Sequence, residues 1–182
     1  MFRRFRNSAA NPAPLGPAQL QLLSQANQLM ASGQPGQAAA LFARLAGAME
    51  TSNHPRRAAN LHAQAAHAYA DSQAEQSALA HARSALTLFI QYKMVQRTPI
   101  FYANITRKLA NRGMKNSADA LVKEFGPQVG AIPAAAPSAD TPRGVLPTNC
   151  PQCGAPLHGS ETTWIDTITA ECGYCGASIR AA

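Results

Sequence analysis

The middle of the chain, residues 17–126, mixes Ala- and Leu-rich apolar stretches with Gln and other polar residues, and confines Gly and Pro to a few positions. The first turn of a helix tolerates proline, because the backbone N–H groups there have no partner within the helix. Three prolines stand at such starts: Pro17, Pro55 and Pro99. Glycine adopts the left-handed conformation that often ends a helix, and three glycines stand at such ends: Gly33, Gly113 and Gly126. This pattern predicts six helices, over residues 17–32, 35–51, 55–71, 73–93, 99–112 and 116–126.

Polar residues refine two of the predicted helix starts. Thr98, directly before a proline, is predicted to be an N-cap, because its hydroxyl can accept a bond from a loose N–H of the first turn. Ser72 and Glu75 have the spacing of a capping box. We interpret Asp71 and Glu75 as capping groups rather than as an acid–base pair.

The predicted helices repeat with an offset of 40 residues. Apolar residues match at positions 38, 78 and 118, at 42, 82 and 122, and at 45, 85 and 125. The first helices of the three pairs match at 26, 66 and 106 and at 29, 69 and 109. A constant period of this size indicates stacked helical hairpins, because each hairpin must bury its apolar face against a neighbour.

The repeat resembles the tetratricopeptide repeat family over about 110 residues. The matching spacings are A-x-x-L, G-x-x-x-x-A and A-x-x-x-F within residues 26–42, and H-A-Y-A-D-S-Q-A-E-Q-S-A in the second unit. The period of 40 exceeds the family's ~34, and a plain antiparallel bundle is the alternative. We therefore expect a mainly α fold of three antiparallel helical hairpins. The resemblance implies a concave surface carrying Leu23 and five polar partner-binding residues: Asn27, Asn60, His67, Arg107 and Asn111.

Composition separates the remaining parts of the chain. Residues 1–16 are a basic lead predicted to be disordered, residues 127–147 are a Pro/Ala-rich linker, and residues 148–182 contain the cysteines. Residues 1–147 hold 15 Lys+Arg and 6 Asp+Glu, a net of +9, whereas residues 148–182 hold one Arg and three acidic residues, a net of −2. The sequence shows neither a secretory signal nor an apolar run near the ~20 residues that span a bilayer. We expect a cytoplasmic protein without stable membrane association.

All four cysteines lie in the C-terminal part, as C-P-Q-C-G and C-G-Y-C-G: Cys150, Cys153, Cys172 and Cys175. In a reducing compartment, paired C-x-x-C motifs favour metal ligands over disulfides. Four thiolates from two tight turns suit one structural Zn²⁺ ion, because they form a closed tetrahedral site. The pattern resembles a zinc ribbon, and the β-branched stretch T-T-W-I-D-T-I-T-A-E between the motifs predicts strands. Iron in a rubredoxin-like site is the alternative.

The sequence contains no recognisable catalytic constellation. His62, His67 and His81 have no carboxylate or cysteine at matching helical spacing and are interpreted as packing or surface residues. We therefore expect a non-enzymatic adaptor or assembly factor that docks protein partners, with an acidic or extended peptide segment as one form of partner. Arg107, Lys108, Arg112 and Lys115 form a basic cluster, which makes a nucleic-acid-binding zinc-ribbon protein the first alternative. A rubredoxin-like electron carrier is the second.

Overall fold

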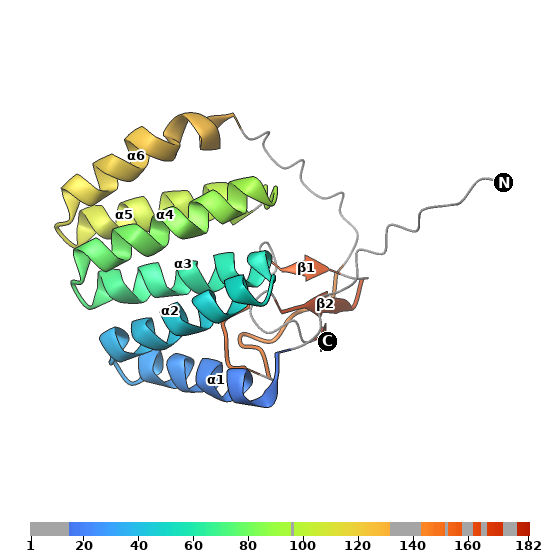
Figure 1. Cartoon of the computed structure of the whole chain (residues 1–182). Helices are drawn as coiled ribbons and strands as arrows, with labels where there is room; N and C mark the ends of the chain where they lie inside the picture. The colour runs from blue at the N-terminus through green and yellow to red at the C-terminus, as the bar shows by residue number, and fades with distance from the viewer. Residues whose placement is uncertain are drawn as a thin grey trace.

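The computed structural model describes residues 15–95, 97–131, 143–151, 153–157, 162–164, 167–172 and 178–182. These residues form six helices: α1 (Pro17–Ala31), α2 (Pro35–Thr51), α3 (Pro55–Asp71), α4 (Glu75–Gln91), α5 (Arg97–Asn111) and α6 (Lys115–Gly130). The helices follow one another from α1 to α6, and the C-terminal strands lie beside them (Figure 1). The six predicted helices are present, and the mainly α class is confirmed.

Turns of one type connect the helices, and they explain the sequence period. Each contains one residue with a positive φ, at 20-residue intervals: Gly33, Asn53, Gln73, Lys93 and Gly113. The amide after each of these residues bonds back to a carbonyl near the helix end, as Gln34 does to Leu29 at 2.8 Å. This is the Schellman arrangement, which satisfies carbonyls at a helix C-terminus. Two such turns with two helices make the 40-residue repeat, and the ends predicted at Gly33 and Gly113 are confirmed.

The predicted capping box at Ser72 and Glu75 is wrong. Ser72 lies just past the end of α3, where its hydroxyl donates a hydrogen bond to the Tyr69 carbonyl at 3.1 Å. Glu75 instead accepts a hydrogen bond from the Ser117 hydroxyl of α6 at 2.6 Å. The side chain of Glu75 thus ties two helices together, an interaction across 42 residues that local spacing does not reveal.

Two further helix boundaries differ from the prediction. Thr98 lies inside α5, which begins one residue earlier, and its buried hydroxyl donates to the Met94 carbonyl at 2.9 Å. The last helix does not stop at Gly126 but continues through Pro127 to Gly130, into the segment predicted as linker. Gly126 serves close packing instead, because a Cβ at this position would lie 3.3 Å from the Tyr102 hydroxyl of α5.

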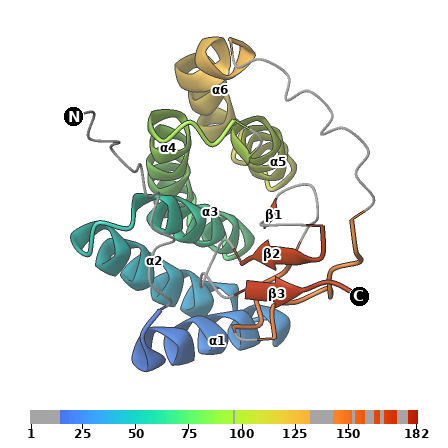
Figure 2. The ribbon, with the colours of Figure 1, turned by 90° about the vertical axis from the view of Figure 1, so that its right-hand side faces the viewer.

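Helix α3 is the centre of the helical part, surrounded by α2, α4, α5 and the C-terminal strands (Figure 2). Six of its alanines are fully buried: Ala58, Ala59, Ala65, Ala66, Ala68 and Ala70. Their small side chains let neighbouring helices approach on several sides at once. Apart from Leu61 of α3 itself, the largest fully buried side chains come from other helices, among them Phe42 of α2 and Phe89 of α4.

The third hairpin departs from the register that the sequence repeat predicts. Val122 was matched to Phe42, but its side chain is 49% exposed, and the neighbouring Leu121 is buried in its place. Likewise Thr106 was matched to the fully buried Ala26 and Ala66, but it is only half-buried, and the neighbouring Ile105 of α5 is fully buried. Among the described residues α6 is the last helix, and no further hairpin of this part of the chain covers its outer face.

The C-terminal part forms a small antiparallel sheet in the order β1 (Thr163–Trp164), β2 (Thr169–Glu171) and β3 (Ser178–Arg180) among the described residues. Strands β1 and β2 fall in the stretch predicted to be extended. Val145 exchanges two backbone hydrogen bonds with Ala182, at 2.9 and 3.0 Å, so the end of the predicted linker also belongs to this unit. Within the described part of the chain, no helix is both long and apolar enough to cross a lipid bilayer.

Candidate metal centre and adjoining groove

Three of the four predicted metal ligands meet at one point. The Sγ atoms of Cys150, Cys153 and Cys172 all lie within 4.8 Å of one another, and each residue is at most 2% exposed. Cys175 lies outside the described residues. The Cys153 and Cys172 sulfurs are 3.8 Å apart, which is too long for a disulfide bond of ~2.05 Å. A tetrahedral ion with metal–sulfur bonds of ~2.3 Å has sulfur–sulfur edges of about 3.8 Å, so the cluster has the dimensions of a metal site.

Backbone hydrogen bonds shape the first cysteine turn. The Cys150 amide donates to the Ala155 carbonyl and the Gly154 amide donates to the Cys150 carbonyl, both at 2.8 Å. Gly154 has a φ of +73°, a left-handed conformation that glycine adopts at little cost. The Asn149 side chain adds a 3.0 Å hydrogen bond to the Gly154 carbonyl. These backbone bonds bring Cys150 and Cys153 together on one closed turn.

The cysteine cluster is buried against the helices. Its three described cysteines share one apolar core with residues of α1, α2 and α3, including Leu23 and Ala26 of α1. Asn27 of α1 donates a hydrogen bond from Nδ2 to the Cys153 carbonyl at 2.9 Å. Asn27, predicted to lie on a partner-binding surface, therefore contacts the C-terminal part of the same chain, and Leu23, predicted on the same surface, is buried in the core that includes the cysteines. That part covers the face of α1 and the adjacent face of α3 (Figure 2).

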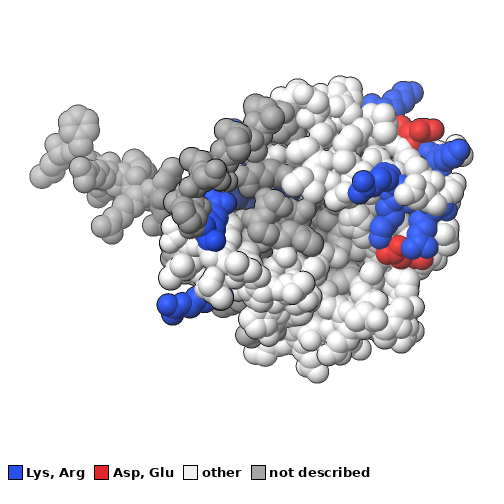
Figure 3. All heavy atoms as spheres, turned by 180° about the vertical axis from the view of Figure 1, so that it is seen from behind, with Lys and Arg blue, Asp and Glu red and all other residues white. Residues whose placement is uncertain are grey.

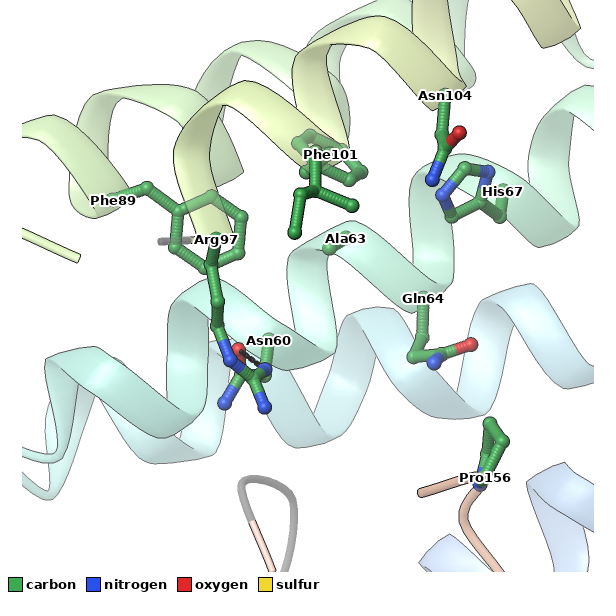
Figure 4. A pocket seen from close by; sticks show the side chains of 10 residues that line it. Asn60, Ala63, Gln64, His67, Phe89, Arg97, Phe101, Asn104 and Pro156 are labelled. Atoms are coloured by element: carbon green, nitrogen blue, oxygen red, sulfur yellow. Dashed lines mark hydrogen bonds between the residues drawn. The ribbon is translucent and has the colours of Figure 1, made fainter. Parts of the chain in front are cut away.

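Beyond the C-terminal part, the same face of α3 remains open as a groove between α3 and α5. A cavity of about 170 Å³ lies at one end, where Pro156 forms part of the wall, and a larger hollow of about 610 Å³ lies at the other. Gln64, His67 and Asn104 line both, so the two spaces adjoin. Figure 4 shows the smaller cavity, with Asn60 and Arg97 at one end and His67 and Asn104 at the other.

Four of the five predicted partner-binding residues line the groove. Asn60 and His67 line the small cavity, and His67, Arg107 and Asn111 line the larger hollow. The fifth, Asn27, is hydrogen-bonded to the C-terminal part instead. Asn60 is only 3% exposed and accepts a hydrogen bond from Arg97 at 2.5 Å. Sequence reasoning missed Gln64 and Asn104. Their positions at helical intervals on α3 and α5 are compatible with the groove but do not by themselves distinguish it from a solvated face.

His67 has an unusual environment. Its Nδ1 is buried and has no hydrogen-bond partner among the described residues. The ring packs edge-on against Phe101 of α5, with the ring centroids 5.4 Å apart. Burial, and to a lesser extent the charge of Lys108, lowers the pKa of His67 from 6.5 to about 4, with the charge of Asp71 partly opposing both. His67 is therefore a neutral imidazole at neutral pH, with one unsatisfied nitrogen beside the groove.

The low pKa of His67 predicts acid-sensitive stability. In the unfolded chain the imidazole binds a proton near pH 6.5, whereas in the folded chain it does so only near pH 4. Lowering the pH through this interval therefore favours unfolding, and His67 should account for about 2 kcal/mol of the stability lost between pH 7.5 and 5. Urea unfolding of the wild type and of His67→Gln at both pH values measures this. The variant should lose correspondingly less stability on acidification; equal losses would contradict the assignment.

The far end of the groove is basic. Asp71, predicted to be a capping group, instead pairs with Lys108 and Arg112 of α5, each at 2.7 Å. Arg107 donates a hydrogen bond to the Asn104 side chain at 2.9 Å. Three cations and one carboxylate line this hollow, a local net charge of three minus one, or +2. Figure 3 shows Lys and Arg side chains gathered around acidic ones at one end of the molecule.

A second polar cluster lies between α2, α3 and α4. His62 Nδ1 is 2.8 Å from His81 Nδ1, and His62 Nε2 is 3.2 Å from a Glu50 carboxylate oxygen. The Tyr69 ring stacks on His81 with centroids 5.3 Å apart. Burial lowers the pKa of His81, the charge of His62 acts in the same direction, and Glu50 opposes. These residues are 12 and 19 positions apart, so helical spacing within one element does not reveal the cluster.

Comparison of the chain with protein-family models, curated proteins and solved structures found no match.

Proposed function

We propose that Cys150, Cys153, Cys172 and Cys175 bind one zinc ion as a structural site of the zinc-ribbon type. Three buried sulfurs within 4.8 Å of one another, two of them 3.8 Å apart, support this, because four thiolates around zinc form a closed site. The burial of the described sulfurs beneath α1 favours a structural role over electron transfer. A rubredoxin-like iron site with the same ligands is the alternative.

In this proposal the metal organises a segment too small to fold by itself. The strands have two or three residues each, so they bury little apolar surface. A structural zinc ion contributes on the order of 10 kcal/mol to such modules. The bound ion would thereby hold the Cys153 turn in the position where Asn27 bonds to it.

We infer that the protein is a non-catalytic cytoplasmic adaptor or assembly factor. Helical hairpins of the tetratricopeptide type would provide a rigid frame, and the zinc-bound segment would complete its inner face. The observation that carries this proposal is the groove between α3 and α5, which stays open beside the docked C-terminal part. Its lining of amides and cations suits recognition of a protein segment, since these groups bind backbone and carboxylates.

Nucleic-acid binding is a second candidate, favoured by the three cations at the end of the groove. Phosphate contacts require Lys or Arg along the contacting surface. The small cavity at the other end is instead lined largely by apolar and amide side chains, with Arg97 engaged by Asn60. This distribution favours a protein partner.

Partner capture tests the proposed function directly. The full-length, tagged protein, expressed in its native cells, should retain a protein partner in constant proportion after nuclease treatment. That partner, purified alone, should bind the purified protein with a defined stoichiometry in isothermal titration calorimetry. Recovery of nucleic acid only, with all protein lost after nuclease treatment, would support the second candidate. Failure of every captured protein to bind directly would contradict the adaptor proposal.

A further inference from the structure

The groove between α3 and α5 has a defined length and direction. Asn60 of α3 contacts Arg97 of α5, and Asp71 contacts Lys108 and Arg112, so the two helices run parallel along its walls. From Asn60 to Asp71 is eleven residues of helix, which corresponds to about 16 Å. An extended chain rises ~3.3 Å per residue. The groove is therefore as long as about five residues of an extended peptide.

The small cavity at one end is suited to an apolar side chain. Its walls include four apolar side chains: Ala63, Phe89, Ile100 and Phe101. Its volume of about 170 Å³ is comparable to cavities of ~150 Å³ that hold a benzene ring. Polar Asn60 and Arg97, already bonded to each other, lie at one end of it (Figure 4). A phenyl or branched aliphatic side chain would fit this space.

The other end is suited to a carboxylate. Asp71 balances only one of the three cations that line the larger hollow, and Arg107 is exposed. A second carboxylate there would reduce the excess positive charge, and Arg can bind it with two parallel hydrogen bonds. Asp71 lies eight residues after Ala63 on α3, a separation of about 12 Å.

The middle of the groove offers a group that requires a ligand. The unpartnered Nδ1 of His67 is buried at the position that both cavities share. A neutral imidazole nitrogen can accept a hydrogen bond or donate one, and a buried polar atom without a partner is costly. The peptide backbone of a bound segment would supply the missing partner, with the Gln64 and Asn104 amides at the same level.

We propose that this groove binds an extended peptide segment with an aromatic or branched apolar residue followed four positions later by Glu or Asp. Residues four apart in an extended chain face the same side and lie about 13 Å apart, which matches the 12 Å along α3 between Ala63 in the wall of the small cavity and Asp71 in the basic hollow. The apolar side chain fills the small cavity, the carboxylate meets Arg107, and the backbone between them bonds to His67. This inference rests on the proposed adaptor function and specifies the partner's chemistry.

Fluorescence anisotropy with the full-length, metal-loaded protein tests the proposal. The probe is a fluorescein-labelled peptide of Gly and Ser in which three serines separate a phenylalanine from a glutamate. We expect saturable binding. Replacing the glutamate by lysine, replacing the phenylalanine by serine, or leaving one serine between them should each weaken binding about 10-fold, the effect of losing one favourable contact of ~1.4 kcal/mol.

Protein variants connect the binding to the named residues. Arg107→Glu should weaken binding of the glutamate peptide about 5- to 10-fold, so that the protein no longer binds it more tightly than the lysine peptide. His67→Phe keeps an aromatic ring beside Phe101 but lacks Nδ1, and should weaken the binding of both peptides about 2- to 10-fold. Lys123→Glu, a reversal at an exposed position of α6 outside the groove lining, is the matched control and should change neither. Helical circular dichroism verifies that each variant is folded.

Three results would overturn the proposal: equal affinity for the glutamate and lysine peptides, affinity unchanged by Arg107→Glu, or no binding of any peptide in the series. Tighter binding of a ten-nucleotide oligothymidylate that competes with the peptide would assign the groove to nucleic acid instead. If none of the peptides binds while a captured partner binds the purified protein directly, the groove inference is wrong and the adaptor function stands. If neither the peptides nor any captured partner binds, both proposals are wrong.

Discussion

Replacing Cys172 with serine is expected to detach the C-terminal part from the helices. The loss of one of four thiolates weakens metal binding, and a structural zinc site contributes on the order of 10 kcal/mol to the folding of a small module. Leu23 and Ala26 of α1, now buried in the same core as the cysteines, would become exposed. The helical signal in circular dichroism should change little, because α3 to α6 have a core of their own.

Three measurements check this expectation. Elemental analysis of protein expressed with zinc and iron both available should find one zinc per wild-type chain and markedly less in Cys172→Ser. Limited proteolysis should cut residues 143–182 of the variant rapidly. Hydrogen exchange should increase in α1. Val145→Ser is the matched control, since this side chain of the same unit is 76% exposed and should have no such effects.

Several outcomes would contradict the zinc assignment. Red protein containing one iron per chain would support the rubredoxin-like alternative instead. Wild-type protein without any bound metal would remove the structural role altogether. Global loss of helix in Cys172→Ser would show that the helices depend on the C-terminal part for folding, contrary to the separate core of α3 to α6.

The second large effect is expected from Phe42→Ala. Phe42 is fully buried between α1, α2 and α3, and truncating such a residue removes apolar burial and leaves a cavity. The expected loss in the free energy of unfolding is about 3–5 kcal/mol. Val122→Ala is the matched control, because the sequence repeat makes the two positions equivalent. Its side chain is 49% exposed, so the expected loss is about 0.5 kcal/mol or less.

Chemical denaturation of both variants at one pH distinguishes the equivalence of residues 42 and 122 that the repeat predicts from the difference in burial that the structure shows. Equal losses would mean that residues 42 and 122 occupy the same environment, as the 40-residue repeat alone predicts. A loss at position 122 above about 2 kcal/mol would mean that the outer face of α6 is covered, for example by a second molecule, since surface substitutions normally cost less.

The helix pattern was predictable because its signals are local. A proline at a helix start or a glycine at a helix end acts through the conformation of that residue and its immediate hydrogen bonds. Gly33 and Gly113 illustrate this, and the helices they end appear where predicted. Asn53, Gln73 and Lys93 make the same turns without glycine, so composition did not single them out.

The predictions that failed concern side chains with two competing partners. Glu75 had a plausible local role as a cap, but the Ser117 hydroxyl of α6 binds it instead. Asp71 was likewise interpreted as a capping group, but it forms ion pairs with Lys108 and Arg112 of α5. In each case a partner about 40 residues away replaces a local one. Such partners are adjacent only because the helices stack with that period.

The sequence by itself determined the six helices, their 40-residue period and the two C-x-x-C motifs, because each depends on residues close together in the chain. Only the tertiary structure decided which surface stays open. It placed the C-terminal part over Asn27, left His67 and Arg107 beside a groove, and buried His67 so that its pKa falls to about 4. These properties depend on what packs against a side chain from elsewhere in the fold, and no local pattern encodes that.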